Sequence, residues 1–97
     1  MTVNNRVFIS GIGMVSPLGL DAPSTWEQLI QGHSGVDQIT AFDTEGFDTR
    51  FAAQVKGFEP ESYLDRKLVR RMDRFAQFAA VAAKEACDNA GIRIDLE

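Results

Sequence analysis

The sequence contains few of the residues that usually reveal a protein's chemistry. Its 97 residues include one cysteine, one histidine, one tryptophan and one tyrosine. A single cysteine excludes an internal disulfide and favours a reducing compartment. No apolar run approaches the ~18 residues that cross a bilayer. A signal peptide is excluded too, because only Arg6 is basic ahead of the first apolar run and no small-residue cleavage site follows it. We therefore expect a cytoplasmic protein with no membrane contact.

Positive charge is also scarce. Ten Lys and Arg residues against fourteen Asp and Glu residues give a net charge of -4, which disfavours general binding to nucleic acid. The hydrophobic fraction of 44% and the charged fraction of 25% are those of an ordinary soluble globular protein. A chain of this length forms one domain at most.

Apolar residues and turn signals predict the first elements of the chain. Residues 7–12, VFISGI, are almost continuously apolar, as in a strand that is covered on both faces of a sheet. Residues 21–32, DAPSTWEQLIQG, predict a helix with Asp21 or Ser24 as its cap and Gly32 as its stop. The apolar residues of this helix share one face at helical spacing: Trp26, Leu29 and Ile30.

The middle of the chain carries weaker signals. Residues 33–48 mix turn residues with scattered hydrophobic ones, and we expect an ordered loop there. Residues 50–55, RFAAQV, predict a second strand. Pro60, with Glu61 in the first turn, predicts the start of a short helix.

A long helix near the C-terminus is the strongest local prediction. The segment DRFAQFAAVAAKEACDNAG runs from Asp73, a good cap, to Gly91, a good stop. Its centre, residues 78–83, is apolar on every side, which is typical of a helix that is buried all round. Two strands and two helices cannot enclose such a helix in a layered sheet. We therefore expect an α/β chain that forms the N-terminal part of a larger layered fold, incomplete as given, with no complete independent domain in residues 1–97.

The first predicted strand leads into a turn with three glycines, Gly11, Gly13 and Gly19. The dinucleotide-binding fingerprint needs G-x-G-x-x-G running directly into a helix. Here Ser16 stands at the third glycine position and Pro17 prolongs the turn. The Gly-Lys-Ser/Thr of a P-loop does not occur either. The pattern favours glycines that permit close backbone packing at the exit of the strand, with a nucleotide-binding domain as an alternative.

Neither the histidine nor the cysteine has a catalytic context. The stretch GHSG, residues 32–35, lacks the second glycine of the nucleophile elbow because Val36 stands there, so we interpret His33 as a loop residue. Cys87 lies on the apolar side of the long helix, one turn from its C-terminus, where neither the apolar setting nor the helix dipole favours a thiolate. We interpret Cys87 as structural, and we expect no catalytic residue and no metal site in this chain.

One cluster of positive charge stands out from this acidic chain. The segment DRKLVRRMDR, residues 65–74, holds half of all the basic residues: Arg66, Lys67, Arg70, Arg71 and Arg74. On one continuous helix these residues would fall within an arc of about 140°, unless Asp73 caps a new helix and interrupts the first. Two interpretations stay open. One is a solvated face balanced by Glu59, Glu61 and Asp65, and the other is a docking surface for an anionic partner.

Four segments in order resemble a known family. RVFISGIGMVSPLG, TWEQLIQGHSGV, FDTEGFDTRFAAQV and RRMDRFAQFAAVAAKEACDNAG are similar to the N-terminal part of β-ketoacyl-acyl-carrier-protein synthases. The resemblance covers nearly the whole chain. It is to the type II-like condensing enzymes of fatty acid synthesis, with aromatic polyketide ketosynthases as near relatives. It implies a thiolase-like layered fold, with a mixed β-sheet and a buried helix, and a homodimer.

The resemblance also implies an acyltransferase reaction, the decarboxylative Claisen condensation of an acyl thioester with malonyl-carrier protein. In this family a cysteine at a helix N-terminus carries the acyl group, and two histidines stabilise the negative charge that develops. All three lie in later parts of the family's sequences, and neither Cys87 nor His33 matches them. No cofactor is implied, because phosphopantetheine arrives on the carrier protein.

For the basic cluster, the resemblance favours docking. In such synthases this region helps to bind the acidic helix of acyl carrier protein, and the matching positions are Lys67, Arg70 and Arg71, flanked by Arg66 and Arg74. Three functions stay open. The chain is part of a condensing enzyme (a fatty acid synthase component, a polyketide ketosynthase or a catalytically dead chain-length partner subunit), or a stand-alone carrier-protein-binding module, or a nucleotide-binding domain.

Overall fold

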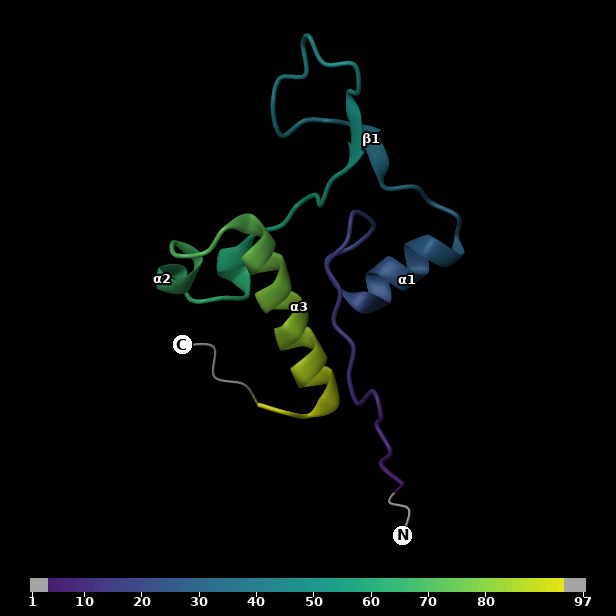
Figure 1. Cartoon of the computed structure of the whole chain (residues 1–97), viewed down its shortest axis with the longest axis vertical. Helices are drawn as coiled ribbons and strands as arrows, with labels where there is room; N and C mark the ends of the chain where they lie inside the picture. The colour runs from purple at the N-terminus through teal and green to yellow at the C-terminus, as the bar shows by residue number, and fades with distance from the viewer. Residues whose placement is uncertain (1–3, 94–97) are drawn as a thin grey trace.

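An extended N-terminal segment passes between two helices. The computed structural model of the chain describes residues 4–93. Figure 1 shows the first part of the chain, in purple, running between α1 (Ala22–Ile30) and α3 (Arg74–Ala90). The short helices η1 (Pro60–Ser62) and α2 (Arg66–Val69) precede α3, as the proline at position 60 predicts for the first of them. A small hairpin completes the order of elements.

The helix α1 forms where the sequence predicts it. The carboxylate of Asp21 accepts a hydrogen bond from the backbone N–H of Ser24 at 2.8 Å, and a proline lies in the first turn. At the other end Gly32 has a φ of 76°, and the N–H of His33 donates to the carbonyl of Gln28 at 3.1 Å. This is the pattern of a Schellman cap. The predicted cap and stop of this helix are therefore confirmed.

The helix α3 is also predicted correctly, but its surroundings differ from the expectation. It begins after Asp73 and ends at Gly91, whose φ of 76° is left-handed. Val81 is its buried residue, whereas Ala79 and Ala83 are exposed. This corrects the expectation of burial all round, because the described elements cover the helix on part of its surface only. Within residues 4–93, no helix has both the length and the apolar character needed to cross a membrane.

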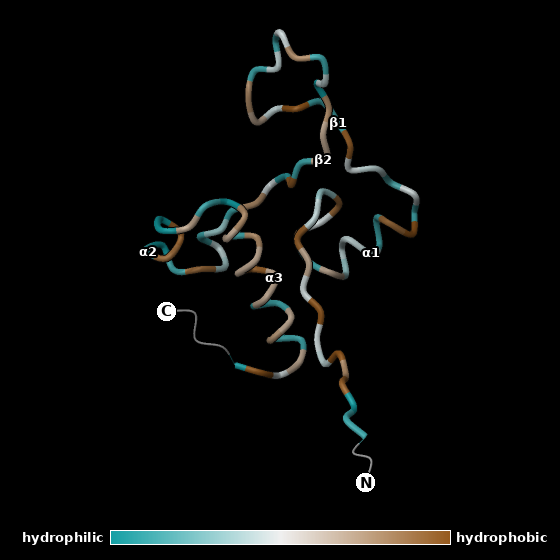
Figure 2. The backbone as a smooth tube through the Cα atoms, in the orientation of Figure 1, coloured by the Kyte–Doolittle hydropathy of each residue, from teal (hydrophilic) through white to brown (hydrophobic). Residues whose placement is uncertain are grey.

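Residues 7–12 are extended, but they pair with no strand in the part of the chain that the structure describes. The neighbouring backbone meets α3 instead. Asn89 Oδ1 accepts the N–H of Ile12 at 3.2 Å, and Glu85 Oε1 accepts the N–H of Met14 at 2.8 Å. Figure 2 shows apolar residues, in brown, along this extended segment. Its first apolar residues are exposed to water: Val7, Phe8 and Ile9. The strand prediction is thus wrong for this chain, because a strand forms only through hydrogen bonds with a neighbouring strand.

The sheet is a two-stranded antiparallel hairpin. The strand β1 (Val36–Gln38) pairs with β2 (Phe51–Ala53), with Asp37 opposite Ala52. The prediction of a strand in residues 50–55 is confirmed. β1 lies in the predicted loop, where pairing with β2 outweighs the turn-rich composition. The hairpin projects away from the helices (Figure 1), and the radius of gyration is accordingly 17.1 Å, against about 13 Å for a compact domain of 100 residues.

The hydrophobic core is small and lies beside α3. Its buried members are Phe58, Leu64 and Val81. Partly buried residues pack against them: Val15, Leu20, Val55, Val69, Met72, Phe78 and Ala80. The predicted apolar face of α1 is exposed, with Trp26 at 62%. The core therefore holds together the region from η1 to α3, while α1 and the hairpin contribute little to it.

Candidate functional site

The glycines of the first turn face the backbone of α3. A Cβ atom added to Gly13 would overlap the carbonyl oxygen of Ala82, and one added to Gly11 would overlap that of Ala86. The interpretation of these glycines as sites of close backbone packing is confirmed. Carbonyl oxygens carry partial negative charge, which repels a phosphate, whereas an anion site presents N–H groups. The geometry of these two glycines therefore disfavours nucleotide binding.

Ser16 closes the turn that follows. Its N–H donates to the carbonyl of Gly19 at 2.9 Å, and its hydroxyl lies 2.8 Å from Oγ1 of the buried Thr25. The same hydroxyl accepts the N–H of Leu18 at 3.1 Å. The serine at the third position of the glycine pattern thus ties the turn to α1.

The first N–H groups of α1 are bonded to carboxylates of the chain itself. Glu85 Oε2 accepts the N–H of Ala22 at 2.9 Å, and Asp21 accepts that of Ser24. The Ser24 hydroxyl and, after it, the Ser24 backbone N–H lower the pKa of Asp21 from its ordinary value of 3.8. Because internal carboxylates fill this helix end, it offers little to an external anion.

His33 and Cys87 lie on separate elements. His33 is exposed just beyond α1, and Cys87 is a free, half-buried thiol in α3. Among residues 4–93, no three His, Cys, Asp or Glu side chains are grouped so as to hold a metal ion. The expectation that this chain contributes no catalytic residue stays a prediction.

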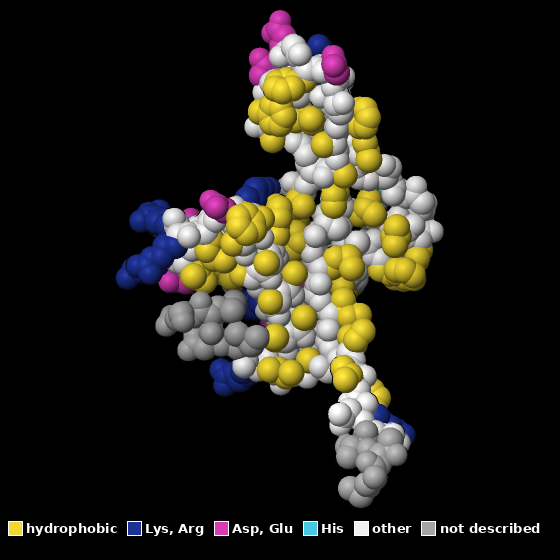
Figure 3. Space-filling model, in the orientation of Figure 1, with side chains coloured by type: hydrophobic (Ala, Val, Ile, Leu, Met, Phe, Trp, Pro, Cys, Tyr) yellow, Lys and Arg dark blue, Asp and Glu magenta, His cyan; other side chains and the backbone are white. Residues whose placement is uncertain are grey.

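The five cationic residues surround the junction between α2 and α3. They are all exposed: Arg66, Lys67, Arg70, Arg71 and Arg74. We call Lys67, Arg70 and Arg71, with the flanking Arg66 and Arg74, the basic turn. Figure 3 shows Lys and Arg side chains, in dark blue, gathered at the left edge of the molecule over α2.

The basic turn does not lie on one continuous helix. α2 ends at Val69, with Arg70 as its cap, and α3 begins at Arg74. Between them Asp73 has an extended backbone and accepts the N–H of Gln77 at 3.0 Å through its carbonyl. The interruption at Asp73 that the sequence suggests is confirmed. The five cations therefore do not form a single arc on one helix but are distributed over α2, the turn after it and the start of α3.

Lys67 and Arg71 line a hollow in the surface. Asp65 and Leu68 complete its lining, and its volume is about 320 Å³. The lining therefore combines two cations with a half-buried leucine and one carboxylate. Such a surface suits a partner that presents acidic groups around an apolar contact.

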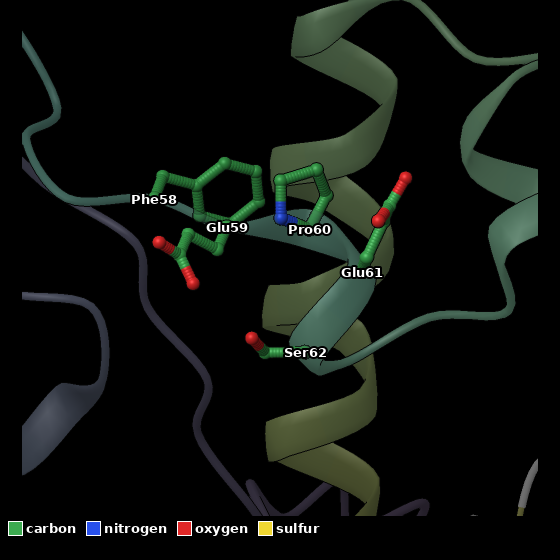
Figure 4. Close-up of a pocket in the computed structure, with 5 residues that line it drawn as sticks. All are labelled: Phe58, Glu59, Pro60, Glu61 and Ser62. Atoms are coloured by element: carbon green, nitrogen blue, oxygen red, sulfur yellow. The ribbon is translucent and has the colours of Figure 1, made fainter.

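A second hollow lies at η1. Five consecutive residues line it, 58–62, which include Glu59 and Glu61. Figure 4 shows the carboxylates of these two residues pointing in different directions. Of the three acids that would balance the charge of the basic turn, only Asp65 lines the same hollow as Lys67 and Arg71 in the described chain. This favours a surface with exposed positive charge over one whose positive charges are fully balanced by neighbouring carboxylates.

Arg74 lies against aromatic rings. Its guanidinium carbon is 5.5 Å from the ring centre of Phe58 and 5.1 Å from that of Phe78. These distances are in the range of cation–π contacts, and the two rings themselves meet edge to face at 4.9 Å. Arg74 therefore stabilises the core beside α3, which distinguishes it from the other four cations.

Gln77 holds the turn from the side of α3. Its Nε2 donates to the carbonyl oxygens of Val69 at 3.3 Å and Met72 at 3.2 Å. Sequence reasoning missed this residue, as it missed Glu85 and Asn89. The one local signal for Gln77 is its place in the first turns of α3, where side chains lean toward the helix N-terminus.

Comparison with known proteins places the chain in a family. Residues 4–96 match the family model described as "Beta-ketoacyl synthase, N-terminal domain". The 3-oxoacyl-[acyl-carrier-protein] synthase 2 of Staphylococcus aureus (strain COL) is 45% identical over 95 residues, which are 98% of this chain and 23% of that protein. The synthase 2 of Vibrio cholerae is 42% identical over 92 residues, 95% of this chain and 22% of that protein.

A solved structure is also similar. The structure of the ishigamide ketosynthase/chain length factor superposes with a TM-score of 0.80 at 36% identity, over 88% of this chain and 21% of that one. The predicted fold class, the N-terminal part of a thiolase-like α/β fold, is confirmed by this likeness. The chain spans less than a quarter of the length of the curated relatives it matches. It belongs to the β-ketoacyl synthase family, and its match lies in the N-terminal domain model of that family.

Proposed function

We propose that the full-length protein carrying this chain is a 3-oxoacyl-[acyl-carrier-protein] synthase, which condenses an acyl thioester with malonyl-carrier protein and releases carbon dioxide. The observation that carries this proposal is the 45% identity to a synthase 2 over 98% of the chain. This chain contributes structural scaffold through α1, the extended segment and α3. The acylated cysteine and the two histidines belong to the part of the relatives' length that these residues do not span.

The basic turn is the proposed docking site for acyl carrier protein. Support comes from its exposed cations and from the hollow that Lys67 and Arg71 line, in a chain whose net charge is -4. Exposed ion pairs of this kind contribute about 0.2–1 kcal/mol each. They act over a Debye length of about 8 Å at physiological salt. Binding should therefore weaken steeply as salt rises, with most of the effect on the association rate.

The proposal also covers the oligomeric state, the compartment and the partners that the resemblance implies. The protein acts as a homodimer in the cytoplasm, with no resident cofactor and with neither nucleic acid nor membrane as a partner. Phosphopantetheine reaches the enzyme on the carrier protein.

A second candidate is a polyketide ketosynthase or its chain-length partner subunit. It is favoured by the likeness to the ishigamide ketosynthase/chain length factor, at a TM-score of 0.80. The higher identity to the two synthase 2 proteins, 45% and 42% against 36%, favours fatty acid synthesis. The presence of an acylated cysteine separates an active synthase from a catalytically dead partner.

The experiment has two arms. The full-length protein is supplied with a fatty acyl thioester and malonyl-carrier protein, and formation of 3-oxoacyl-carrier protein is followed by mass spectrometry. If no saturated acyl chain yields product, the enzymatic proposal is contradicted.

The second arm replaces Lys67, Arg70 and Arg71 together with Glu, and measures the Kd of the full-length protein for the carrier protein at low salt.

We expect the reversed variant to bind the carrier protein at least about tenfold more weakly, because three attractive contacts become repulsive. The matched control reverses Arg6, Arg50 and Lys56 to Glu, which changes the net charge equally at sites outside the basic turn. Equal losses in the two triple variants, or an unchanged Kd in the first, would show that the basic turn is not the docking site.

A further inference from the structure

We propose that Gln77 is a positioning residue for carrier-protein binding, which sets the orientation of Arg70 and Arg71 by holding the backbone on both sides of them. This inference rests on the proposed docking function of the basic turn. It goes beyond that function because Gln77 is uncharged, and its amide is committed to the chain's own backbone.

The hydrogen bonds of Gln77 bracket the two arginines. Nε2 donates to the carbonyl of Val69, directly before Arg70, at 3.3 Å, and to the carbonyl of Met72, directly after Arg71, at 3.2 Å. One amide group therefore fixes both ends of a two-residue segment. The bonds are partly buried, so water competes with them less than at an open surface.

The turn needs such support because its own helix is short. α2 has four residues, Arg66–Val69, and one helical turn is far below the length at which helices are stable alone. Its last carbonyl groups have no partners farther along the helix. The N–H of Met72 donates to the carbonyl of Val69 at 3.2 Å, and Gln77 supplies a second donor to the same oxygen.

The side chains around the turn agree with this role. Val69 and Met72 are partly buried and pack against the core of Phe58, Leu64 and Val81, whereas the two arginines between them are exposed. Core packing thus holds the side chains of Val69 and Met72, and Gln77 holds their carbonyls. The two arginines are left to point outward from a backbone that cannot rotate freely, which lowers the entropy lost when a partner binds.

The test compares carrier-bound and carrier-free substrates in the full-length enzyme. Gln77→Ala removes the amide, and Gln77→Glu keeps the size of the side chain but replaces the donor with an acceptor. We expect each variant to raise KM for malonyl-carrier protein about three- to tenfold with little change in kcat, the range expected for the loss of one or two hydrogen bonds. Acylation by an acyl-pantetheine that carries no protein should proceed at the wild-type rate. Gln31→Ala, at the exposed end of α1, is the matched control and should leave both rates unchanged.

A double-mutant cycle separates positioning from general support of the fold. If Gln77 acts through the arginines, Gln77→Ala in an Arg70→Ala, Arg71→Ala background should raise KM no further. An equal rise in both backgrounds, an unchanged KM in the wild-type background, or a matching loss with the carrier-free substrate would each overturn the inference. The docking proposal fails separately, if reversing the charges of the basic turn has no effect on carrier affinity.

Discussion

Glu85 and Ala22, 63 residues apart in the sequence, are joined by a hydrogen bond of 2.9 Å from the backbone N–H of Ala22 to Oε2 of Glu85. The other oxygen of the same carboxylate accepts the N–H of Met14 at 2.8 Å. One half-buried side chain of α3 thus holds both the extended segment and the start of α1. Its negative charge also lies at the positive end of the α1 dipole, which strengthens the contact.

Glu85→Ala should lower the free energy of unfolding of the full-length protein by about 2 kcal/mol, because two N–H groups lose a charged acceptor. Urea denaturation measures the loss, and amide hydrogen exchange should show faster exchange at Met14 and Ala22. Glu27→Ala, on the exposed face of α1, is the control. Equal losses in the two variants would mean that the hydrogen bonds of Glu85 add no more to the free energy of unfolding than an exposed glutamate does.

Gly13→Ala should disrupt the contact between the extended segment and α3. The added methyl group would overlap the carbonyl oxygen of Ala82, and backbone cannot yield as a flexible side chain does, so we expect a loss of at least about 2 kcal/mol. Thermal denaturation measures it, with Ser10→Ala in the exposed part of the same segment as the control. Adding Ala82→Gly should not restore stability, since the overlap is with backbone. A rescue by Ala82→Gly would contradict the geometry.

The cap of α1 should depend on pH through Asp21. Hydrogen bonds from Ser24 lower the folded-state pKa of Asp21 below 3.8. The cap therefore contributes stability above pH 3.8, and this contribution is lost as the pH falls through the lowered folded pKa. In an NMR titration Ser24→Ala should move the midpoint of Asp21 upward, toward 3.8, while Ser34→Ala should leave it in place. A midpoint that is the same in both variants would show that the Ser24 hydroxyl is not the cause.

Arg74→Ala should affect stability more than docking. The lost contacts with Phe58 and Phe78 should reduce the free energy of unfolding by about 1 kcal/mol. Arg71→Ala is the matched comparison, because it removes the same charge from the hollow and should weaken carrier binding with little effect on stability. If Arg74→Ala instead weakens carrier binding as strongly as Arg71→Ala and leaves stability unchanged, Arg74 belongs to the docking surface.

Local signals predicted the helices well. The capping of α1 by Asp21, the turn at Pro60 and the stop of α3 at Gly91 depend on residues a few positions apart, and such interactions can be read directly from sequence. The packing role of the first glycines was also predictable, since it follows from what a missing side chain permits.

Long-range partners could not be read in the same way. Residues 7–12 have the composition of a strand, but strand formation depends on a partner elsewhere in the chain or beyond it. The hydrogen bonds of Glu85 and Asn89 span 63 to 77 residues. In the sequence these two residues stand out only as polar residues four positions apart on a largely apolar helix. Gln77 was missed because its one local signal, a place in the first turns of α3, does not identify the backbone carbonyls that it binds.

The contact between residues 11–14 and α3 predicts where this segment tolerates change. Gly11 and Gly13 face the helix backbone with no room for a side chain. Ile12 and Met14 instead donate their N–H groups to side chains of α3 and expose 54% and 39% of their surface. In a saturation library, permitted residue types should therefore alternate: almost none at 11 and 13, many at 12 and 14. This alternation has the two-residue period of a β-strand. Here its cause is packing against a helix, not pairing with another strand.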